Sequence, residues 1–462
     1  MPSELITVSP INGQELLRRA YTGEAEIARI VQQARTAQKA WAARSLDERC
    51  KAVSAAVARF VANKSDIALA ITRQMGRPLR YTPNEVAGFE ERAHHMISIA
   101  AQALAPIEIP QKDTLTRFIA REPVGVVFTI APWNYPLLTA VNSIVPALVA
   151  GNSVILKHSD QTPLCAELMV QAFAESGLPA GVFQFVHATH DTVRRLIQAP
   201  EINYVSFTGS VPGGHAVEAA AAGRFIGLGL ELGGNDPAYV RADADLAQAV
   251  DTLVDGAYFN SGQSCCGIQR IYVAQSVYQE FVERAVALTN QYVLGDPLDP
   301  GTTLGPVVRA SAAKEIHGVV DEAIRKGASN LIDAGRFGMA QAGNAYVAPA
   351  LLTNVNHDMA VMNDECFGPV VGIMPVKDDA QAIALMNDSP YGLTACVFTR
   401  DMQAALRIGG QIETGTFFMN RCDYLDPALA WTGVKNTGHG VSLSALGYEP
   451  VTQAKSYHLR SL

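Results

Sequence analysis

Short apolar runs alternate with helical segments between residues 123 and 233, and this rhythm limits the fold more than any other feature. Residues 124–131 form a continuous apolar run suited to a buried strand, and similar runs begin at residues 153, 182 and 204. The segments between them carry helix signals, such as Pro136 at a first helical position. Strands that alternate with helices form an open parallel sheet through right-handed crossovers, which predicts a Rossmann-like α/β domain.

The rest of the chain predicts a second domain and a small β arm. At 462 residues the chain exceeds the usual size of one hydrophobic core. We expect one sheet domain from residues 1–110 and 123–230, and a second α/β domain from residues 231–420. The alternating character of residues 111–122 and, more weakly, of residues 451–460 predicts an extended arm and a tail strand, and we assign residues 111–122 and 440–462 to this part of the chain.

Composition argues against several classes of protein. Hydrophobic residues make up 48% of the chain and charged residues 17%, which is a globular composition. The formal net charge is −8 with no basic run, so nucleic acid and anionic membranes are poor partners. The seven cysteines include no CxxC pair, which predicts reduced thiols and no metal site. With neither a signal peptide nor a sufficiently long apolar stretch, we expect a cytoplasmic protein.

A cysteine in a loop of small residues is the first candidate for chemistry. Cys265 follows the segment 260–264, Asn-Ser-Gly-Gln-Ser, where the backbone can approach a substrate closely. A thiolate placed there could attack an electrophilic carbon. Free cysteine is, however, often just a small buried side chain, and the adjacent Cys266 leaves the choice of thiol open on chemistry alone.

Two polar residues next to predicted elements could assist such a thiol. Glu231 ends an apolar run, where partial desolvation would raise its pKa and let it accept a proton. Asn134 precedes the helix that Pro136 opens, so its amide could donate to a developing oxyanion. The ordinary alternatives are a solvated glutamate and a helix-capping asparagine.

Polar groups after neighbouring strands suit a nucleotide. Lys157 and Asp160 follow the second strand, where a cation and an acid match a ribose and its phosphate. An acid bonded to the ribose 2′-hydroxyl disfavours a 2′-phosphate, so Asp160 favours NAD over NADP. Gly209-Ser210 begins a helix whose N–H groups could hold a pyrophosphate. The alternatives are a surface ion pair and a plain turn, since no GxGxxG follows the first strand.

Taken in order, these segments resemble the aldehyde dehydrogenase superfamily from about residue 10 to the end. Any one segment is a weak signal, but together and in the family's order they are specific. The matching segments are 132–136 (PWNYP), 157–163, 207–210 (FTGS), 231–234 (ELGG), 259–265 (FNSGQSC), 365–370 (ECFGPV), 391–394 (YGLT) and 431–435 (WTGVK).

The resemblance implies NAD(P)-dependent oxidation of an aldehyde to a carboxylic acid through a thiohemiacetal and a thioester. The family's nucleophile falls on Cys265, its base on Glu231, and its oxyanion holder on Asn134 with the backbone N–H of Cys265. The cofactor-contacting positions are Trp133, Lys157, Asp160, Gly209, Ser210, Glu365 and Phe367.

The domains acquire roles by the same resemblance. Residues 1–110 and 123–230 would bind NAD(P), and residues 231–420 would form the catalytic domain that carries the nucleophilic cysteine. Residues 111–122 and 440–462 match the family's oligomerisation region, which implies a homodimer or a homotetramer.

The substrate is less constrained than the reaction. Family pocket positions fall on Tyr135, Thr139, Asn142, Phe259, Ser264, Cys266, Leu425 and Trp431. This wall shows no evident cation, so a small aliphatic or aromatic aldehyde fits it at least as well as a semialdehyde, although the semialdehyde dehydrogenases, including succinate-semialdehyde enzymes, are the most similar branch. Arg421 is the one cation nearby in sequence that could hold a carboxylate, and a structural salt bridge is its alternative role.

Three other functions compete with this interpretation. A CoA-acylating relative would commonly lack the base, so Glu231 argues against it. A cysteine hydrolase would need a Cys–His pairing, which the sequence does not reveal. A catalytically idle relative would have little use for Cys265, Glu231 and Asn134 together.

Overall fold

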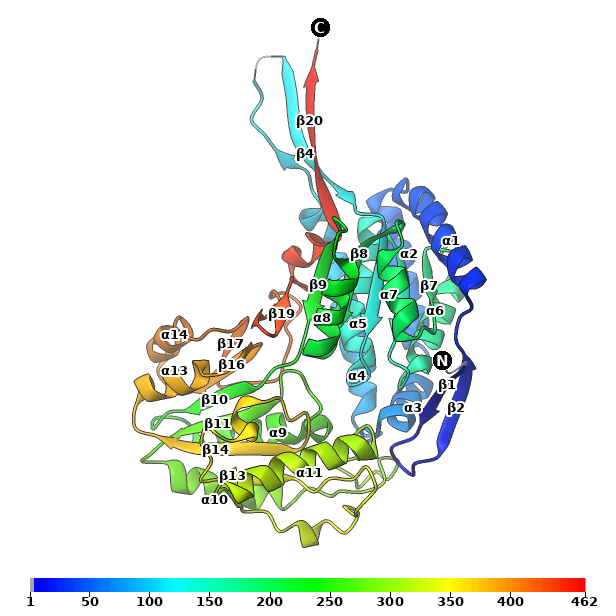
Figure 1. Ribbon diagram of the computed structural model, residues 1–462. Coiled ribbons are helices and arrows are strands. Elements are labelled where there is room, and N and C mark those ends of the chain that lie inside the picture. Colours follow the sequence, from blue (N-terminus) through cyan, green and yellow to red (C-terminus); the bar gives the residue numbers. More distant parts are fainter. Residues whose placement is uncertain (1–3, 113, 462) are drawn as a thin grey trace.

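Two largely parallel sheets and a projecting β arm organise the chain (Figure 1). The computed structural model describes residues 4–112 and 114–461. The first sheet has the order β19-β9-β8-β5-β6-β7, and the second the order β12-β13-β14-β11-β10-β16-β17. The predicted pair of α/β units around parallel sheets is therefore confirmed.

The first sheet is built mainly from the short apolar runs between residues 123 and 233. Its strands are β5 (Val126–Ala131), β6 (Ser153–His158), β7 (Phe183–Phe185), β8 (Ile202–Thr208), β9 (Gly227–Glu231) and β19 (Gly438–His439). Every residue of β5 and β6 is buried, which explains their continuous apolar sequences. All neighbours pair in parallel except β19, which runs antiparallel to β9.

Helices cover this sheet and complete its core. The helices before it are α1 (Glu24–Ala42), α2 (Leu46–Val61), α3 (Lys64–Met75) and α4 (Thr82–Ala103), and its crossover helices are α5 (Pro136–Ala150), α6 (Pro163–Glu175), α7 (His190–Gln198) and α8 (Val211–Ala221). Pro136 and Pro163 begin their helices, as a fixed φ and a missing N–H allow. A hairpin of β1 (Glu4–Val8) and β2 (Glu15–Ala20) precedes α1.

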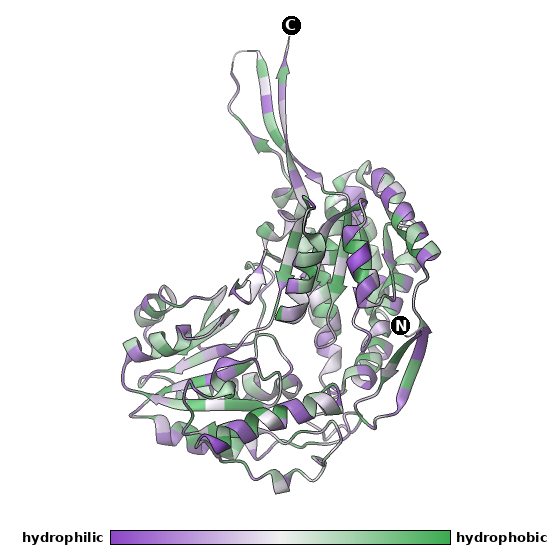
Figure 2. Cartoon of the chain, viewed as in Figure 1, coloured by the Kyte–Doolittle hydropathy of each residue, from purple (hydrophilic) through white to green (hydrophobic). Residues whose placement is uncertain are grey.

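The second sheet carries the remaining helices. Its strands are β10 (Asp236–Val240), β11 (Ile268–Ala274), β12 (Ser329–Asn330), β13 (Ala350–Thr353), β14 (Val370–Val376), β16 (Thr394–Phe398) and β17 (Thr416–Met419). Its helices are α9 (Leu246–Tyr258), α10 (Tyr278–Thr289), α11 (Ala310–Arg325), α12 (Ala360–Asn363), α13 (Asp379–Asn387) and α14 (Met402–Gly409). The smaller elements are the 3₁₀ turns η1 (Phe259–Gly262), η2 (Ala334–Arg336) and η3 (Ala445–Tyr448), and the strand pair β15 (Tyr391–Gly392) with β18 (Val434–Lys435). Figure 2 shows hydrophobic residues concentrated in the strands of both sheets.

The arm consists of β3 (Ile107–Glu108), β4 (Leu115–Pro123) and β20 (Thr452–Arg460). Strands β4 and β20 pair in antiparallel register over their whole length and project from the body (Figure 1). The segment predicted as tail, 440–462, divides: η3 packs against α4 and α5 in the body, and the part from Thr452 onward lies in the arm. In the part of the chain that the structure describes, no helix combines the length and apolarity that a bilayer crossing requires.

Candidate active site

The polar residues singled out from the sequence gather where the strands of the first sheet end. Asn134 follows β5, Lys157 lies at the end of β6, Gly209 follows β8, and Glu231 is the last residue of β9. These strands are parallel neighbours, so their carboxyl ends share one edge of the sheet. That edge is where open α/β sheets bind ligands.

A strained loop presents the candidate nucleophile. Asn260 and Ser261 have φ of 54° and 56°, and Gly262 has φ of 69°, so three consecutive residues are left-handed. A Cβ at Gly262 would overlap the carbonyl of Gly368, which requires glycine there. Hydrogen bonds hold the strained backbone in place, because Gln263 Oε1 accepts from Val308 N (2.7 Å) and Ser261 Oγ donates to Gly305 O (2.8 Å).

The two adjacent thiols differ in their surroundings. Cys265 is partly exposed and lines a cavity. Cys266 is buried, and its thiol donates to Asp423 Oδ1 at 2.9 Å. Hydrogen bonding with Cys265 and burial raise the pKa of Cys266 well above its usual value, so this thiol resists ionisation. All seven cysteines lie in the described ranges, and none forms a disulfide.

Glu231 faces the same cavity and is anchored by two hydroxyl groups. Its Oε1 accepts from Ser442 Oγ at 2.6 Å, and its Oε2 accepts from Thr208 Oγ1 at 3.2 Å. Burial raises the pKa of Glu231, while the two hydroxyls and the positive charge of Arg92 act in the opposite direction. Glu231 also borders a second cavity of about 20 Å³, which is enough for about one water molecule.

The two glycines that follow Glu231 allow close packing around the thiol. A Cβ at Gly233 would overlap the carboxylate of Glu365, and a Cβ at Gly234 would overlap the carbonyl oxygen of Cys265. Gly234 N donates to Glu365 Oε1 at 3.0 Å. Burial raises the pKa of Glu365 to about 7. Residues 231–234, Cys265 and Glu365 therefore meet at positions where a larger side chain would separate them.

Asn134 lies against the nucleophile loop and is tied to it by a buried network. Its Nδ2 donates to Gln263 O at 3.2 Å, and its own carbonyl accepts from Asn260 Nδ2 at 3.3 Å and from Arg77. Arg77 also donates through Nε to Asn260 Oδ1 (2.9 Å) and pairs with Glu85, both side chains being buried.

The edge of the first sheet where its parallel strands end also carries groups that fit a dinucleotide. The Lys157 ammonium lies 3.1 Å from Asp160 Oδ1, and Tyr21 OH donates to Asp160 Oδ2 at 2.8 Å. Ser210 caps the N-terminus of α8, where it accepts from Gly213 N. A cation, a carboxylate and a helix N-terminus are the partners that ribose and phosphate groups require.

The aromatic residues predicted to contact the cofactor lie together near this edge. The ring of Trp133 stands edge-on to that of Phe367, with centroids 5.6 Å apart. Phe367 has φ of 51°, so its backbone also adopts the strained left-handed region. Tyr21, by contrast, was missed in the sequence, because nothing in its own segment indicates that it reaches Asp160.

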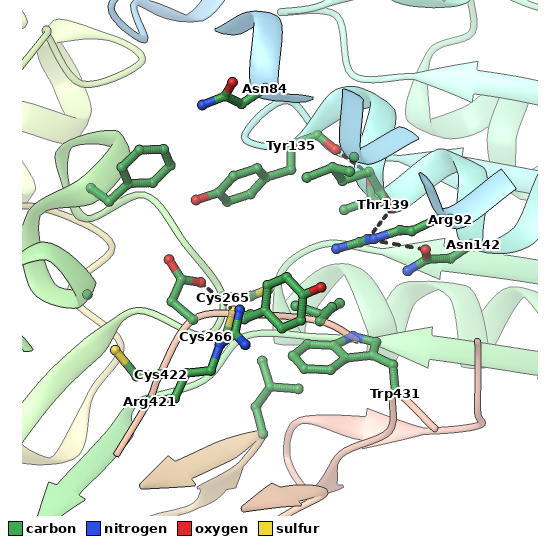
Figure 3. Close-up of a pocket in the computed structure, with 18 of the residues that line it drawn as sticks. Asn84, Arg92, Tyr135, Thr139, Asn142, Cys265, Cys266, Arg421, Cys422 and Trp431 are labelled. Carbon is green, nitrogen blue, oxygen red and sulfur yellow. Dashed lines mark hydrogen bonds between the residues drawn. The ribbon is translucent and has the colours of Figure 1, made fainter. Parts of the chain in front are cut away.

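A cavity of about 880 Å³ opens beside Cys265 (Figure 3). Glu231 lines the same cavity. The predicted pocket residues that line it are Tyr135, Thr139, Asn142, Phe259, Cys266, Leu425 and Trp431. Ser264 does not line it, because its hydroxyl is buried and donates to Asp423 Oδ1 at 3.1 Å. Thr208 and Asp423 line the cavity as well.

The expectation that the pocket wall lacks a cation is wrong. Arg92, from α4, and Arg421 both line the cavity, and Figure 3 shows them approaching it from different elements. Arg92 is far from every pocket motif in sequence, so only the packing of α4 against α5 reveals it. Arg421 is exposed, and its Cζ lies 3.5 Å from the centroid of the Tyr424 ring. Within the described residues Arg421 forms no salt bridge, so the structural salt bridge that was its alternative role is not observed.

Comparison with known proteins identifies the class that this fold and site define. Residues 2–457 match the model of the aldehyde dehydrogenase family. The chain is 34% identical to succinate semialdehyde dehydrogenase [NAD(P)+] Sad of Escherichia coli strain K12, covering 96% of this chain and 95% of the relative. It is also 34% identical to a succinate-semialdehyde dehydrogenase [NADP(+)] of Deinococcus radiodurans, covering 97% and 93%.

Solved structures agree with the sequence relatives. Gox0499 superimposes with a TM-score of 0.95 at 32% identity, covering 99% of this chain and 100% of that chain. Succinic semialdehyde dehydrogenase from Streptococcus pyogenes, solved with NADP+, superimposes with a TM-score of 0.94 at 26% identity, covering 99% and 100%. The chain belongs to the aldehyde dehydrogenase family and is an NAD(P)-dependent oxidoreductase.

The buried Arg77–Glu85 pair predicts a strong dependence of stability on Arg77. Arg77→Met leaves the Glu85 carboxylate buried without its cation, which we expect to cost about 3–5 kcal/mol. Arg284→Met, which removes the exposed pair with Glu280, should cost at most about 0.5 kcal/mol. Thermal unfolding of both variants by calorimetry measures the difference, and equal midpoints would contradict the role assigned to the buried pair.

Proposed function

We propose that this chain oxidises an aldehyde to a carboxylic acid with Cys265 as nucleophile, Glu231 as general base and Asn134 as oxyanion donor. The observation that carries the proposal is a single cavity lined by both a partly exposed thiol and a partly buried carboxylate. The amide of Asn134 lies against the same loop as the thiol. A thiol, a base and an amide donor are the groups that covalent acyl chemistry requires.

The residues act in sequence. The Cys265 thiolate attacks the aldehyde carbon, and the resulting oxyanion accepts hydrogen bonds from the Asn134 amide and the Cys265 backbone N–H. NAD(P)+, when bound, would supply the hydride acceptor, and loss of hydride from the thiohemiacetal carbon would leave a thioester on Cys265. Glu231 then takes a proton from water, the hydroxide attacks the thioester, and the C–S bond breaks to release the acid and the thiolate.

The cofactor would lie along the outer edge of the sheet. Lys157 and Asp160 would hold the adenosine ribose, and the N-terminus of α8 at Gly209-Ser210 would face the pyrophosphate. Glu365 would position the nicotinamide ribose, with Trp133 and Phe367 beside it. We infer a preference for NAD, because the Asp160 carboxylate would repel a 2′-phosphate.

The substrate we infer is a small aldehyde, with semialdehydes included. Relatives bear the names succinate semialdehyde dehydrogenase and 2-hydroxymuconic semialdehyde dehydrogenase. The cavity is wide enough for aliphatic, aromatic and carboxylate-bearing aldehydes, and succinate semialdehyde heads the list to test.

The arm supports assembly into a homodimer or homotetramer. A projecting ribbon of three strands buries little surface by itself, and Leu459 and Ile107 expose 52% and 46% of their surface. We infer that a second copy covers it, and sedimentation at the mass of a single chain would argue against this assembly.

Replacement of Cys265 tests its proposed role as the nucleophile. Cys265→Ser should lower kcat for aldehyde oxidation by at least about 1,000-fold, since a hydroxyl is far less nucleophilic than a thiolate at neutral pH. Cys266→Ser is the matched control and should retain most of the activity, because this thiol is buried and bonded to Asp423. NADH absorbance, measured with and without CoA, reports turnover. Persistent turnover in Cys265→Ser would show that the nucleophile is assigned wrongly, and turnover that requires CoA would favour acyl transfer.

The second prediction concerns the tether of the base. The Ser442 hydroxyl stabilises the charged form of Glu231, so Ser442→Ala should raise the Glu231 pKa further. Because the base must be deprotonated, the acidic limb of kcat against pH should move up by about one pH unit. Ser98→Ala, on the exposed surface of α4, is the control. If the acidic limb does not move in Ser442→Ala, the Ser442 hydroxyl does not control the ionisation of Glu231.

The third prediction concerns cofactor choice. Asp160→Ser removes the carboxylate that would repel a 2′-phosphate, so the ratio of kcat/KM for NADP+ to that for NAD+ should rise about 10-fold. Asp191→Asn, at the partly exposed start of α7, should leave this ratio unchanged. Steady-state kinetics with both dinucleotides measure the ratio, and a fall or no change in Asp160→Ser would overturn the inferred preference for NAD.

A further inference from the structure

Arg92 is buried in the wall of the catalytic cavity without a carboxylate partner. The residue is 7% exposed, and its guanidinium lines the cavity that also holds Cys265 and Glu231. No acidic side chain among residues 4–112 and 114–461 lies within salt-bridge distance of it. A buried cation costs free energy unless a partner compensates it.

The hydrogen bonds of Arg92 leave two of its nitrogens unused. Nη1 donates to Leu138 O (2.8 Å) and to Asn142 Oδ1 (3.2 Å), both on α5. Nε and Nη2 donate to no atom of the described protein, and neither is sealed inside it. The bonds to α5 therefore fix the plane of the guanidinium and leave its remaining donors available to a group inside the cavity (Figure 3).

The two other buried arginines show how unusual this is. Arg77 uses all three guanidinium nitrogens, on Asn260, Glu85 and Asn134. Arg270 also uses all three, on backbone carbonyls and the Tyr272 hydroxyl. Arginines that hold the fold together are thus saturated with acceptors, whereas Arg92 is not.

We propose that Arg92 recognises a carboxylate at the far end of the substrate, so that the preferred aldehydes are semialdehydes of dicarboxylic acids. A guanidinium presents parallel N–H donors that match the two oxygens of a carboxylate. This inference rests on the proposed function, because it assumes that the aldehyde end of the same molecule meets Cys265. Asn142, which accepts from Arg92, positions the guanidinium for that contact.

Acidic residues in the cavity do not make it a site for a cationic aldehyde. Glu91 and Asp251 are exposed, so water screens their charges. Desolvation raises the pKa of Asp255, which disfavours its charged form. Glu231 already accepts hydrogen bonds from the Ser442 and Thr208 hydroxyls. Asp423 is partly buried, and it already accepts hydrogen bonds from the Cys266 thiol and the Ser264 hydroxyl. Arg92 is the charged group that combines burial with unused donors among those that line the described cavity.

The test compares substrates that differ in charge and little else. For wild type and variants, kcat/KM is measured with succinate semialdehyde, with neutral butanal and with cationic 3-aminopropanal. Arg92→Met should lower the ratio of kcat/KM for succinate semialdehyde to that for butanal by about 100-fold, chiefly through KM, since truncating one partner of a buried charged pair is costly. Arg92→Lys keeps the charge and should retain part of the ratio.

Arg421→Met is the matched control from the same cavity. Arg421 is exposed and stacked on Tyr424, so its removal should change the ratio by less than about threefold. A ratio that is unchanged in Arg92→Met, or a preference for 3-aminopropanal in wild type, overturns the inference while leaving Cys265-dependent oxidation of butanal intact. Melting temperatures of the variants separate a loss of recognition from a loss of folding.

A second readout does not depend on turnover. Succinate bound at Arg92 should shield Cys265 from alkylation by iodoacetamide in wild type and in Arg421→Met, but not in Arg92→Met. If no aldehyde is oxidised with either dinucleotide, the proposed function fails, and the protection experiment still decides whether Arg92 binds a carboxylate. Equal protection in wild type and Arg92→Met would exclude it as the anchor.

Discussion

The buried ion pair of Arg77 and Glu85 holds together the elements from which the site is built. Arg77 lies just after α3, Glu85 is in α4, and the Glu85 carboxylate also accepts from Leu137 N (2.8 Å) in the first turn of α5. Arg77 reaches the Asn134 carbonyl and Asn260 Oδ1 as well, and it lies 4.4 Å from the Tyr135 ring centroid. Removing two charges from water is expensive, so such a pair is a poor device for stability alone. Here it fixes the Asn134 segment of the first domain against the nucleophile loop of the second.

The loop of residues 260–265, which carries the proposed nucleophile, keeps its strained backbone because surrounding contacts hold it in that conformation. Left-handed backbone at Asn260 and Ser261 is unfavourable for residues with a Cβ. The Gln263 side chain donates to Asn260 O (3.0 Å) and accepts from Val308 N, so it closes the loop on itself and joins it to the segment that contains Val308. Gly234 then lets the base segment come up to the carbonyl of Cys265. The thiol is thus held by backbone contacts, and its side chain remains available to a substrate.

The sequence predicts the elements and the local motifs well, since both depend on nearby residues. The continuous apolar runs become the fully buried strands β5 and β6, and the polar residues expected at strand ends lie there. The side chains that hydrogen-bond to Glu231 and Asp160 come from distant segments. Ser442 is 211 residues from Glu231 along the chain, and Tyr21 is 139 from Asp160. No local pattern encodes such pairs, because they arise from the packing of whole elements.

Pocket composition illustrates the same limit. The predicted wall came from positions near the motifs, and it missed Arg92 because α4 reaches the cavity through its packing on α5. It included Ser264, whose hydroxyl is buried and donates to Asp423. The direction of a side chain in a tight loop depends on which acceptor the fold brings close, so sequence position alone cannot fix it.

Arg92 and Glu231 interact through their charges, which would link the proposed substrate recognition to the proposed catalysis. The positive charge of Arg92 lowers the pKa of Glu231 against the effect of burial. A carboxylate bound to Arg92 would offset that charge and make Glu231 harder to ionise during turnover. The hydroxyls of Ser442 and Thr208 stabilise the Glu231 carboxylate whether or not Arg92 is neutralised. If Arg92 binds an anion and Glu231 is the general base, as proposed, such uncharged donors suit the site, since a second cation there would compete with Arg92 for the substrate.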